Sequence, residues 1–300
     1  KSGNLNLGVP GIMYLGGFAG FASAWAYENT AANPSGAVSV VVALTCAILA
    51  SMAGGLIYAF LTISLRANQN VTGLALTTFG MGVANFFGVF ILNGASYSAA
   101  PIANKAFSAK IPVLSTLGDF GQVVFSYGFL VYAAIALAIA LHWFLTRTRA
   151  GLNLRAVGEN PATADAAGIN VTLYKYLATC IGAGICGIGG LYYVLDYNQG
   201  IWATTGQIEA LGWLAVALVI FTTWKPLNAI WGAYLFGMLY WLYQFLPTLL
   251  GITMASHITD LVQMLPYVVT IVVLIVVSMR KKKENQPPAH LGLAYFREER

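Results

Sequence analysis

The chain consists mainly of long apolar stretches separated by short polar segments. After an irregular first stretch at residues 1–27, nearly uncharged stretches lie at 36–65, 71–92, 122–145, 174–197, 207–223, 227–245 and 261–279. A helix needs about 20 predominantly apolar residues to cross the hydrocarbon of a bilayer, whereas barrel strands would give short segments of alternating polarity. The pattern therefore predicts an all-α integral membrane protein, a polytopic bundle of about eight transmembrane helices.

The first apolar stretch is less regular than the others. Asn4, Asn6 and Pro10 would be poor in a helix that faces lipid, because backbone groups freed near Pro need partners in protein or in a wet cavity. Interrupted helices of this kind often line a substrate path; the alternative is a plain loop followed by a helix from about Pro10. The chain begins with Lys1 rather than Met, and we expect further residues upstream, a further span among them.

Residues 146–176 form the longest polar interruption between two apolar stretches. Within this segment, Asn160 suits a helix N-cap, Pro161 suits the first helical position and Gly168 suits a helix stop. A short capped helix between two membrane spans indicates a structured docking surface. The alternative is a positively charged loop that only sets the topology.

The distribution of charge indicates a defined orientation in the membrane. Hydrophobic residues make up 58% of the chain and charged residues 8%, whereas soluble domains carry about 25% charged residues. Thirteen of the fifteen Lys and Arg residues fall on the side that carries residues 146–176, and only Lys105 and Lys110 fall on the other side. Cytoplasmic loops are enriched in Lys and Arg, so we expect both ends of the chain in the cytoplasm. The net charge of +5 then reflects topology, and we expect no nucleic-acid partner.

This reading divides the chain into a membrane domain at residues 1–279 and a basic cytoplasmic tail at residues 280–300. Within the domain, Ala178, Gly182, Cys186 and Gly190 recur every four positions. Such a stripe of small residues predicts a face on which another helix packs closely.

Sequence motifs of common catalytic and metal sites are absent. The chain has no G-x-x-x-x-G-K-[ST], no H-E-x-x-H and no C-x-x-C sequence, and the three cysteines, Cys46, Cys180 and Cys186, lie in apolar stretches where we expect them to serve packing. We therefore expect no catalytic residue, no metal and no cofactor on this chain. Asp196 and Glu209 leave open an ion-coupled carrier, and a membrane scaffold without transport is a third alternative.

Residues 151–171, GLNLRAVGENPATADAAGINV, resemble the cytoplasmic signature of permeases of ABC importers. The resemblance is to the branched-chain amino acid, ribose and nucleoside group, and within it to the nucleoside or simple-sugar permeases. Residues 2–18, 211–237 and 287–299 agree with it as well. Pro10 departs from the pattern, because relatives usually carry an acid there, and this difference puts ligand handling in question.

The resemblance implies a type II-like importer permease in a bacterial inner membrane. Its partners would be an ABC ATPase subunit, which binds ATP and Mg²⁺, a second permease subunit (a paralogue or a second copy) and an extracellular substrate-binding lipoprotein. The helix at about residues 160–167 would dock into the ATPase. The implied coupling residues are Arg155, Gly158, Glu159, Asn160, Pro161, Ala164, Asp165 and Gly168.

The resemblance also implies a small-molecule path between helices near the membrane centre. Amides, phenols and acids suit hydroxyl-rich or heteroaromatic ligands. The candidates for this path are Asn4, Asn6, Asn85, Tyr192, Tyr193, Asp196 and Glu209. We expect nucleosides as the substrate, with ribose-like sugars and branched-chain amino acids as alternatives.

Overall fold

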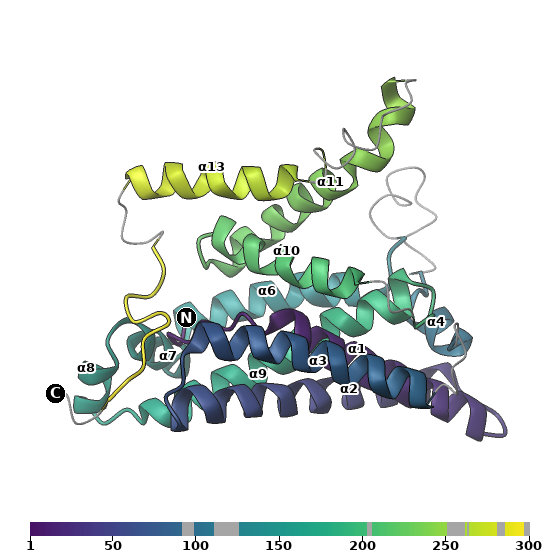
Figure 1. The fold of residues 1–300 in the computed structure, drawn as a ribbon, viewed down its shortest axis with the longest axis horizontal. Coiled ribbons are helices and arrows are strands. Elements are labelled where there is room, and N and C mark those ends of the chain that lie inside the picture. Colours follow the sequence, from purple (N-terminus) through teal and green to yellow (C-terminus); the bar gives the residue numbers. More distant parts are fainter. Residues whose placement is uncertain are drawn as a thin grey trace.

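The computed structural model describes residues 1–91, 99–110, 126–202, 206–250, 262, 264–280 and 286–296. The described residues are predominantly helical, and the one β feature among them is an isolated bridge between Ala99 and Ile201. Long helices run side by side along the long axis of the molecule, with short helices at its two ends (Figure 1). The predicted all-α fold is confirmed.

The main bundle consists of helices that follow the long axis. They are α1 (Val9–Thr30), α2 (Gly36–Ala59), α3 (Gln69–Ile91), α6 (Phe129–Arg147) and α9 (Val171–Tyr192), and the π-helical turns η1 (Phe60–Ser64) and η2 (Tyr193–Tyr197) extend α2 and α9. Helices α10 (Gln207–Phe221), α11 (Pro226–Leu250) and α13 (Leu265–Arg280) lie beyond α6 on one side of the bundle (Figure 1). Short α4 (Pro101–Phe107) lies at one end, and α7 (Arg149–Glu159) and α8 (Pro161–Ala166) lie at the other, beside the N-terminal residues and residues 286–296.

Several of these helices can cross a membrane. In the described part of the chain, length and composition qualify four segments, Gly36–Ser64, Gln69–Phe90, Phe129–Arg147 and Val171–Tyr197, and α10 is a shorter apolar helix. Helices α1, α11 and α13 lie at the remaining predicted spans. The chain is thus a multi-pass membrane protein, while the count of eight crossings stays a prediction.

The boundaries differ from the predicted ones in three places. The span expected from residue 122 begins at Phe129 as α6, and residues 111–125 lie outside the described residues. The loop expected at 93–119 contains α4, which begins at Pro101. The span expected to end at residue 245 continues to Leu250. In each case an element boundary depends on packing against other helices, which an apolar pattern does not specify.

Helix α1 packs between α2, α3 and α9, and it crosses α9 at small residues. A Cβ atom on Gly16 would overlap Ser51 of α2 and would lie 2.5 Å from Cα of Gly187 in α9. The Ser51 hydroxyl also donates a buried hydrogen bond of 3.2 Å to the Ile12 carbonyl. Close backbone approach of this kind is how small residues associate membrane helices.

The packing face of α9 lies one position away from the predicted stripe. Lys175, Thr179, Ala183 and Gly187 are buried, whereas a Cβ atom on Gly182 would meet nothing within 4 Å. The predicted stripe was therefore wrong for Gly182, whereas Cys186 packs against the buried clusters and Gly190 lies against Met13 of α1. Small residues occur on more than one face of α9, so their spacing alone does not say which face meets α1 and α2.

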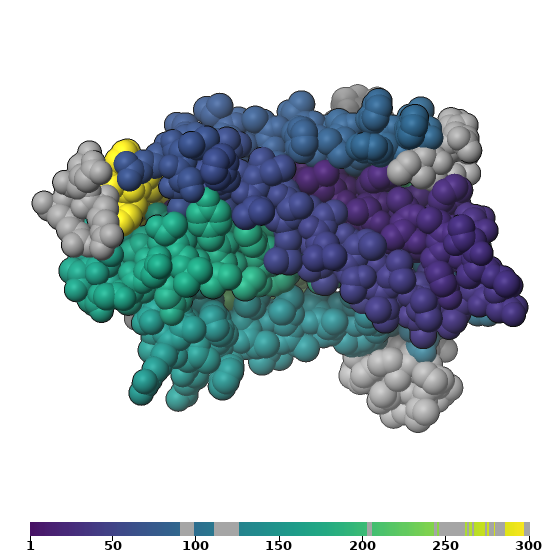
Figure 2. Space-filling model, turned by 90° about the horizontal axis from the view of Figure 1, so that it is seen from below, coloured from purple at the N-terminus to yellow at the C-terminus, as the bar shows by residue number. Residues whose placement is uncertain are grey.

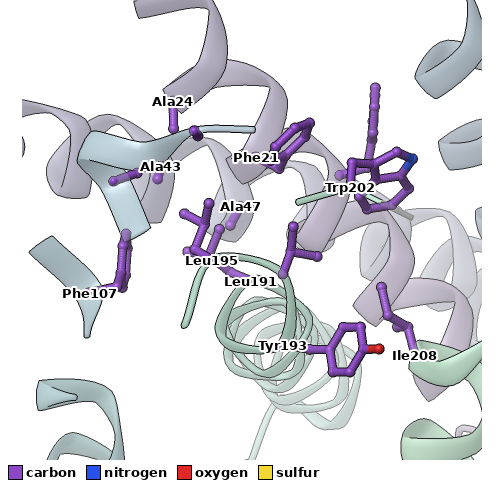
Figure 3. Close-up of a cluster of buried hydrophobic side chains, with 14 of the residues drawn as sticks. Phe21, Ala24, Ala43, Ala47, Phe107, Leu191, Tyr193, Leu195, Trp202 and Ile208 are labelled. Carbon is purple, nitrogen blue, oxygen red and sulfur yellow. The ribbon is translucent and has the colours of Figure 1, made fainter. Parts of the chain in front are cut away.

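An aromatic cluster closes the bundle at the end away from α7 and α8. Trp202, between η2 and α10, lies 5.1 Å from the ring of Phe18 and 6.0 Å from that of Phe21. Leu191 and Leu195 from α9 and η2 pack in the same buried cluster (Figure 3). Through Trp202, the cluster packs the connection between η2 and α10 against α1.

Candidate functional site

The helix expected at about residues 160–167 is present as α8. The side chain of Asn160 accepts a hydrogen bond of 3.0 Å from the Thr163 amide, as an N-cap does. Gly168 has a φ of +83° and its amide donates to the Asp165 carbonyl at 3.0 Å. Glycine suits this left-handed position because a Cβ would be strained there.

A second helix, α7, precedes it and was not predicted. Its N-cap is Thr148, whose hydroxyl accepts a hydrogen bond of 3.1 Å from the Gly151 amide. The threonine before Arg149 was the local signal that could have revealed this helix. Helices α7 and α8 together make a rigid helical hairpin rather than one helix in a loop.

The eight predicted coupling residues gather around the junction of α7 and α8. Arg155, Glu159, Asn160 and Gly168 are exposed, Asp165 is half-buried, and Gly158, Pro161 and Ala164 are buried. Ala164 packs with Val157 and Val171 in a small apolar cluster. The exposed members and Asp165, which we call the α7–α8 surface, are available to another protein, while the buried members hold the hairpin in place.

The N-terminal residues and the C-terminal tail both meet α7 at Gly158. The Gly158 carbonyl accepts a hydrogen bond of 3.1 Å from the His290 amide, and the Gly3 carbonyl accepts one of 3.0 Å from the Gly292 amide. A Cβ atom on Gly158 would overlap the Lys1 carbonyl and lie 3.1 Å from the Gly3 nitrogen. Only glycine permits this three-way contact.

Further hydrogen bonds hold the tail, residues 286–296, along this end of the molecule. Glu159 accepts from the Ala289 amide at 3.3 Å, and Asp165 accepts from the Tyr295 hydroxyl at 2.9 Å. Gln69 accepts from the Leu5 amide at 2.6 Å and donates to the Leu293 carbonyl at 3.3 Å. Figure 2 shows the yellow tail beside the blue start of α3. The sequence analysis did not predict this docking of the tail.

One histidine of the tail has a perturbed environment. Burial of His290, together with the positive charge of Lys175, holds the pKa of its imidazole below the usual value of 6.5. Its Nδ1 is buried and has no hydrogen-bond partner among the described residues. The docked tail therefore favours the neutral imidazole.

The seven residues predicted for the substrate path lie in three separate places. Asn4 and Asn6 lie toward the α7–α8 end: Asn4 donates to the Thr179 hydroxyl at 3.0 Å, and Asn6 accepts from the Gly8 amide at 2.8 Å. The Asn6 side chain thus shapes the backbone turn that leads into α1. The Asn4 Oδ1 is buried and lacks a partner among the described residues.

Asp196 and Tyr192 lie near the opposite end. Asp196 accepts a hydrogen bond of 2.8 Å from the Ser108 hydroxyl, and the neighbouring Leu195 carbonyl accepts one of 2.8 Å from Asn104. These bonds attach the region of α4 to η2. Tyr192 lines an apolar groove of about 790 Å³ between α6, α9, α10 and α11.

The third place surrounds Trp202 and contains Asn85, Tyr193 and Glu209. The Asn85 Oδ1 and the Trp202 Nε1 are both buried without a partner among the described residues. A Cβ atom on Gly88 would lie 2.8 Å from that Nε1, and Asn85 lies three positions before Gly88, on the same face of α3. Trp202 was missed by sequence reasoning, although a tryptophan between two apolar stretches was a visible signal.

Tyr193 and Glu209 complete this third group. Tyr193 is buried at the junction of α9 and η2, and its ring points toward Ile208 at the start of α10 (Figure 3). Glu209 lies in the first turn of α10, where a carboxylate is stabilised by the helix dipole. The Glu209 backbone amide donates a hydrogen bond to the Tyr14 hydroxyl of α1. Tyr193 thus belongs to the same buried cluster as Trp202, and Tyr14, whose ring lies 6.5 Å from that of Trp202, connects Glu209 to the cluster.

Comparison with known proteins identifies the class of this protein. Residues 1–276 match the family described as the permease component of the branched-chain amino acid transport system. The chain belongs to this permease family. No solved structure matches the chain.

Three relatives narrow the group. A putative glucose ABC transporter permease of Haloferax volcanii is 36% identical over 80% of this chain and 68% of its own length. A nucleoside ABC transporter permease of Lactococcus lactis is 30% identical over 91% of this chain and 83% of its own. A guanosine ABC transporter permease of Bacillus subtilis is 33% identical over 79% of this chain and 72% of its own length. The chain is an ABC importer permease of the nucleoside and sugar group, and the predicted family is confirmed.

Proposed function

We propose that the chain imports nucleosides as the membrane subunit of a complex whose ATPase is a separate subunit. The observation that carries the choice of nucleosides is similarity along most of the chain to two permeases named for nucleoside and guanosine transport. The buried Asn85 Oδ1 and Trp202 Nε1, which lack partners in the described part of the chain, support it, because a nucleoside offers both hydrogen-bond donors and acceptors and an aromatic base.

A sugar is the second candidate substrate. It rests on the relative of Haloferax volcanii named as a putative glucose permease, which is 36% identical. Uptake of labelled guanosine by cells that express the complete transporter tests the choice, with guanosine, glucose, ribose and leucine as unlabelled competitors. Competition by guanosine alone supports the nucleoside proposal, whereas competition by glucose or ribose supports the sugar.

The same proposal assigns ATPase docking to the α7–α8 surface. A hairpin that is capped at Asn160, ends at Gly168 and packs on Val171 of α9 is rigid enough to transmit a push into the bundle. On this proposal both chain ends lie in the cytoplasm of a bacterial cell. The complex contains two permease subunits and an extracellular binding lipoprotein.

Two substitutions test the docking surface. Glu159→Ala removes an exposed charge, and Gly168→Val strains the left-handed turn at the end of α8. Both are expected to weaken co-purification with the ATPase, or substrate-stimulated ATP hydrolysis, while membrane insertion is unchanged. Lys105→Ala, at an exposed residue of α4 at the far end, serves as the control. Normal co-purification and normal substrate-stimulated ATP hydrolysis in both variants would indicate that the hairpin serves only the membrane topology.

A chain that purifies without an ATPase would favour the ion-coupled carrier. In that case, proteoliposomes that contain this chain alone would transport the substrate with an ion gradient and without ATP. Transport that requires the ATPase and ATP would exclude this alternative.

A further inference from the structure

A cavity at the start of α9 contains a buried lysine that no feature of the proposed transport path uses. The cavity has a volume of about 440 Å³ and is bounded by η1, the start of α3, the turn after α8, the first turns of α9 and the tail. The charged side chains that line it are Arg66, Asp165 and Lys175. It is separate from the groove that contains Tyr192.

Lys175 is the residue that points to a ligand. Its side chain is only 3% exposed and lines the cavity, and it has no hydrogen-bond or ion-pair partner among the described residues. An ammonium group removed from water is destabilising unless an opposite charge is close. Lys175 therefore favours the binding of an anion in this cavity.

The rest of the lining is also suited to an anion. Helix α9 is 22 residues long and begins at Val171, so its first turn presents amides and the positive end of the helix dipole at the cavity, where Thr172 lies. Arg66 contributes a second cation from a strained left-handed backbone with a φ of 57°. The acid in the lining, Asp165, already accepts a hydrogen bond from Tyr295. Two cations and a helix N-terminus thus outweigh one carboxylate.

The position of the cavity indicates where the anion comes from. It lies at the α7–α8 end of two apolar segments, Gly36–Ser64 and Val171–Tyr197, which are long enough to span a membrane. Leu65, which is next to the lining residue Arg66 in the chain, is 60% exposed. In a bilayer such a side chain faces acyl chains, so the cavity lies at the level of the lipid headgroups.

We infer that this cavity binds the phosphate headgroup of an anionic phospholipid. The phosphate oxygens accept hydrogen bonds from the Lys175 ammonium and from amides in the first turn of α9, and the acyl chains extend from the cavity along the apolar surface that includes Leu65. Leu293, Ala294 and Tyr295 of the tail form one wall of the same cavity. An occupied cavity therefore also strengthens the docking of the tail on α8. Basic pockets between transmembrane helices commonly take anionic headgroups in this way.

The test uses the transporter complex purified in mild detergent and stripped of lipid. Native mass spectrometry counts bound phosphatidylglycerol and phosphatidylcholine at equal concentration, and thermal unfolding is followed with each lipid and with sn-glycerol 3-phosphate or inorganic phosphate. The wild type is expected to retain phosphatidylglycerol at least tenfold more than phosphatidylcholine and to be stabilised by it. The soluble phosphates are expected to give no shift at the same concentration.

Two variants assign the effect to the cavity. Lys175→Met keeps the length of the side chain without its charge, and it should abolish the preference for phosphatidylglycerol. Lys105→Met, which removes an exposed lysine of α4, should leave the preference unchanged. Should Lys175→Met fail to fold, Thr172→Glu places a negative charge at the exposed edge of the cavity and should have the same effect.

The outcomes separate the possible sources of the anion. Retention of phosphatidylglycerol that is equal in the wild type and in Lys175→Met or Thr172→Glu would overturn the inference. So would equal retention of the two lipids by the wild type. Stabilisation by inorganic phosphate or sn-glycerol 3-phosphate without lipid would overturn the lipid source and assign the cavity to a soluble phosphate. None of these outcomes depends on which solute the transporter imports.

Discussion

Tyr295 of the tail donates a hydrogen bond of 2.9 Å from its hydroxyl to the Asp165 carboxylate of α8. The two residues are 130 positions apart in the chain, so this bond joins the C-terminal tail to the helix for which we propose ATPase docking. Gln69 joins the same tail to the N-terminal residues through Leu5 and Leu293. A displacement of α8 would therefore also move both terminal segments.

The first prediction concerns this bond. Tyr295→Phe removes the hydroxyl, and the tail is expected to lose about 1 kcal/mol of docking free energy, which corresponds to roughly fivefold more undocked tail. Distances between spin labels at Asn68 and Leu293, both of which have exposed side chains, would measure the docked fraction. The matched control is Tyr234→Phe, an exposed tyrosine of α11. An unchanged docked fraction in Tyr295→Phe would contradict the prediction.

The second prediction concerns Gly158. Gly158→Ala places a methyl group against the Lys1 carbonyl, and overpacking of this kind costs about 1–3 kcal/mol. We expect the N-terminal residues to leave α7 and the thermal unfolding temperature to fall. Gly182→Ala is the control, because a Cβ atom there meets nothing within 4 Å, and alanine favours a helix over glycine by about 1 kcal/mol. Equal unfolding temperatures in the two variants would show that the contact at Gly158 does not stabilise the fold.

The third prediction concerns pH. Burial and Lys175 lower the pKa of His290 in the docked tail, so the undocked tail binds the proton more readily. Docking is therefore strongest above the usual pKa of 6.5 and weakens as the pH falls below it. Glu159 accepts a hydrogen bond from the amide of Ala289, the residue before His290. The same spin-label distances between pH 8 and pH 5 would report the change.

His290→Gln should remove most of this pH dependence, because glutamine does not titrate in that range. His142→Gln, at the end of α6, should leave the dependence as in the wild type. A tail that undocks equally in the wild type and in His290→Gln as the pH falls would assign the effect to another group.

The fourth prediction concerns Trp202. Trp202→Phe removes the buried Nε1 that lacks a partner among the described residues. It also removes volume from the packed aromatic cluster, so the unfolding temperature should fall modestly. If that donor serves the substrate, uptake of guanosine should weaken roughly fivefold or more. Trp143→Phe, an exposed tryptophan of α6, is the control. Uptake that is unchanged in Trp202→Phe would remove Trp202 from the proposed path.

The sequence alone determined the class of this protein, the approximate spans and the capped turn from Asn160 to Gly168. Membrane helices and helix caps follow from local composition and from residues a few positions apart, so a linear pattern contains them. The tertiary structure decided the rest. The docking of the tail on Asp165, the face of α9 that packs on α1, the cavity at Lys175 and the separation of Asn4 from Trp202 all depend on contacts between distant segments. A pattern along the chain specifies that such faces exist, but only the packed helices specify which of them meet.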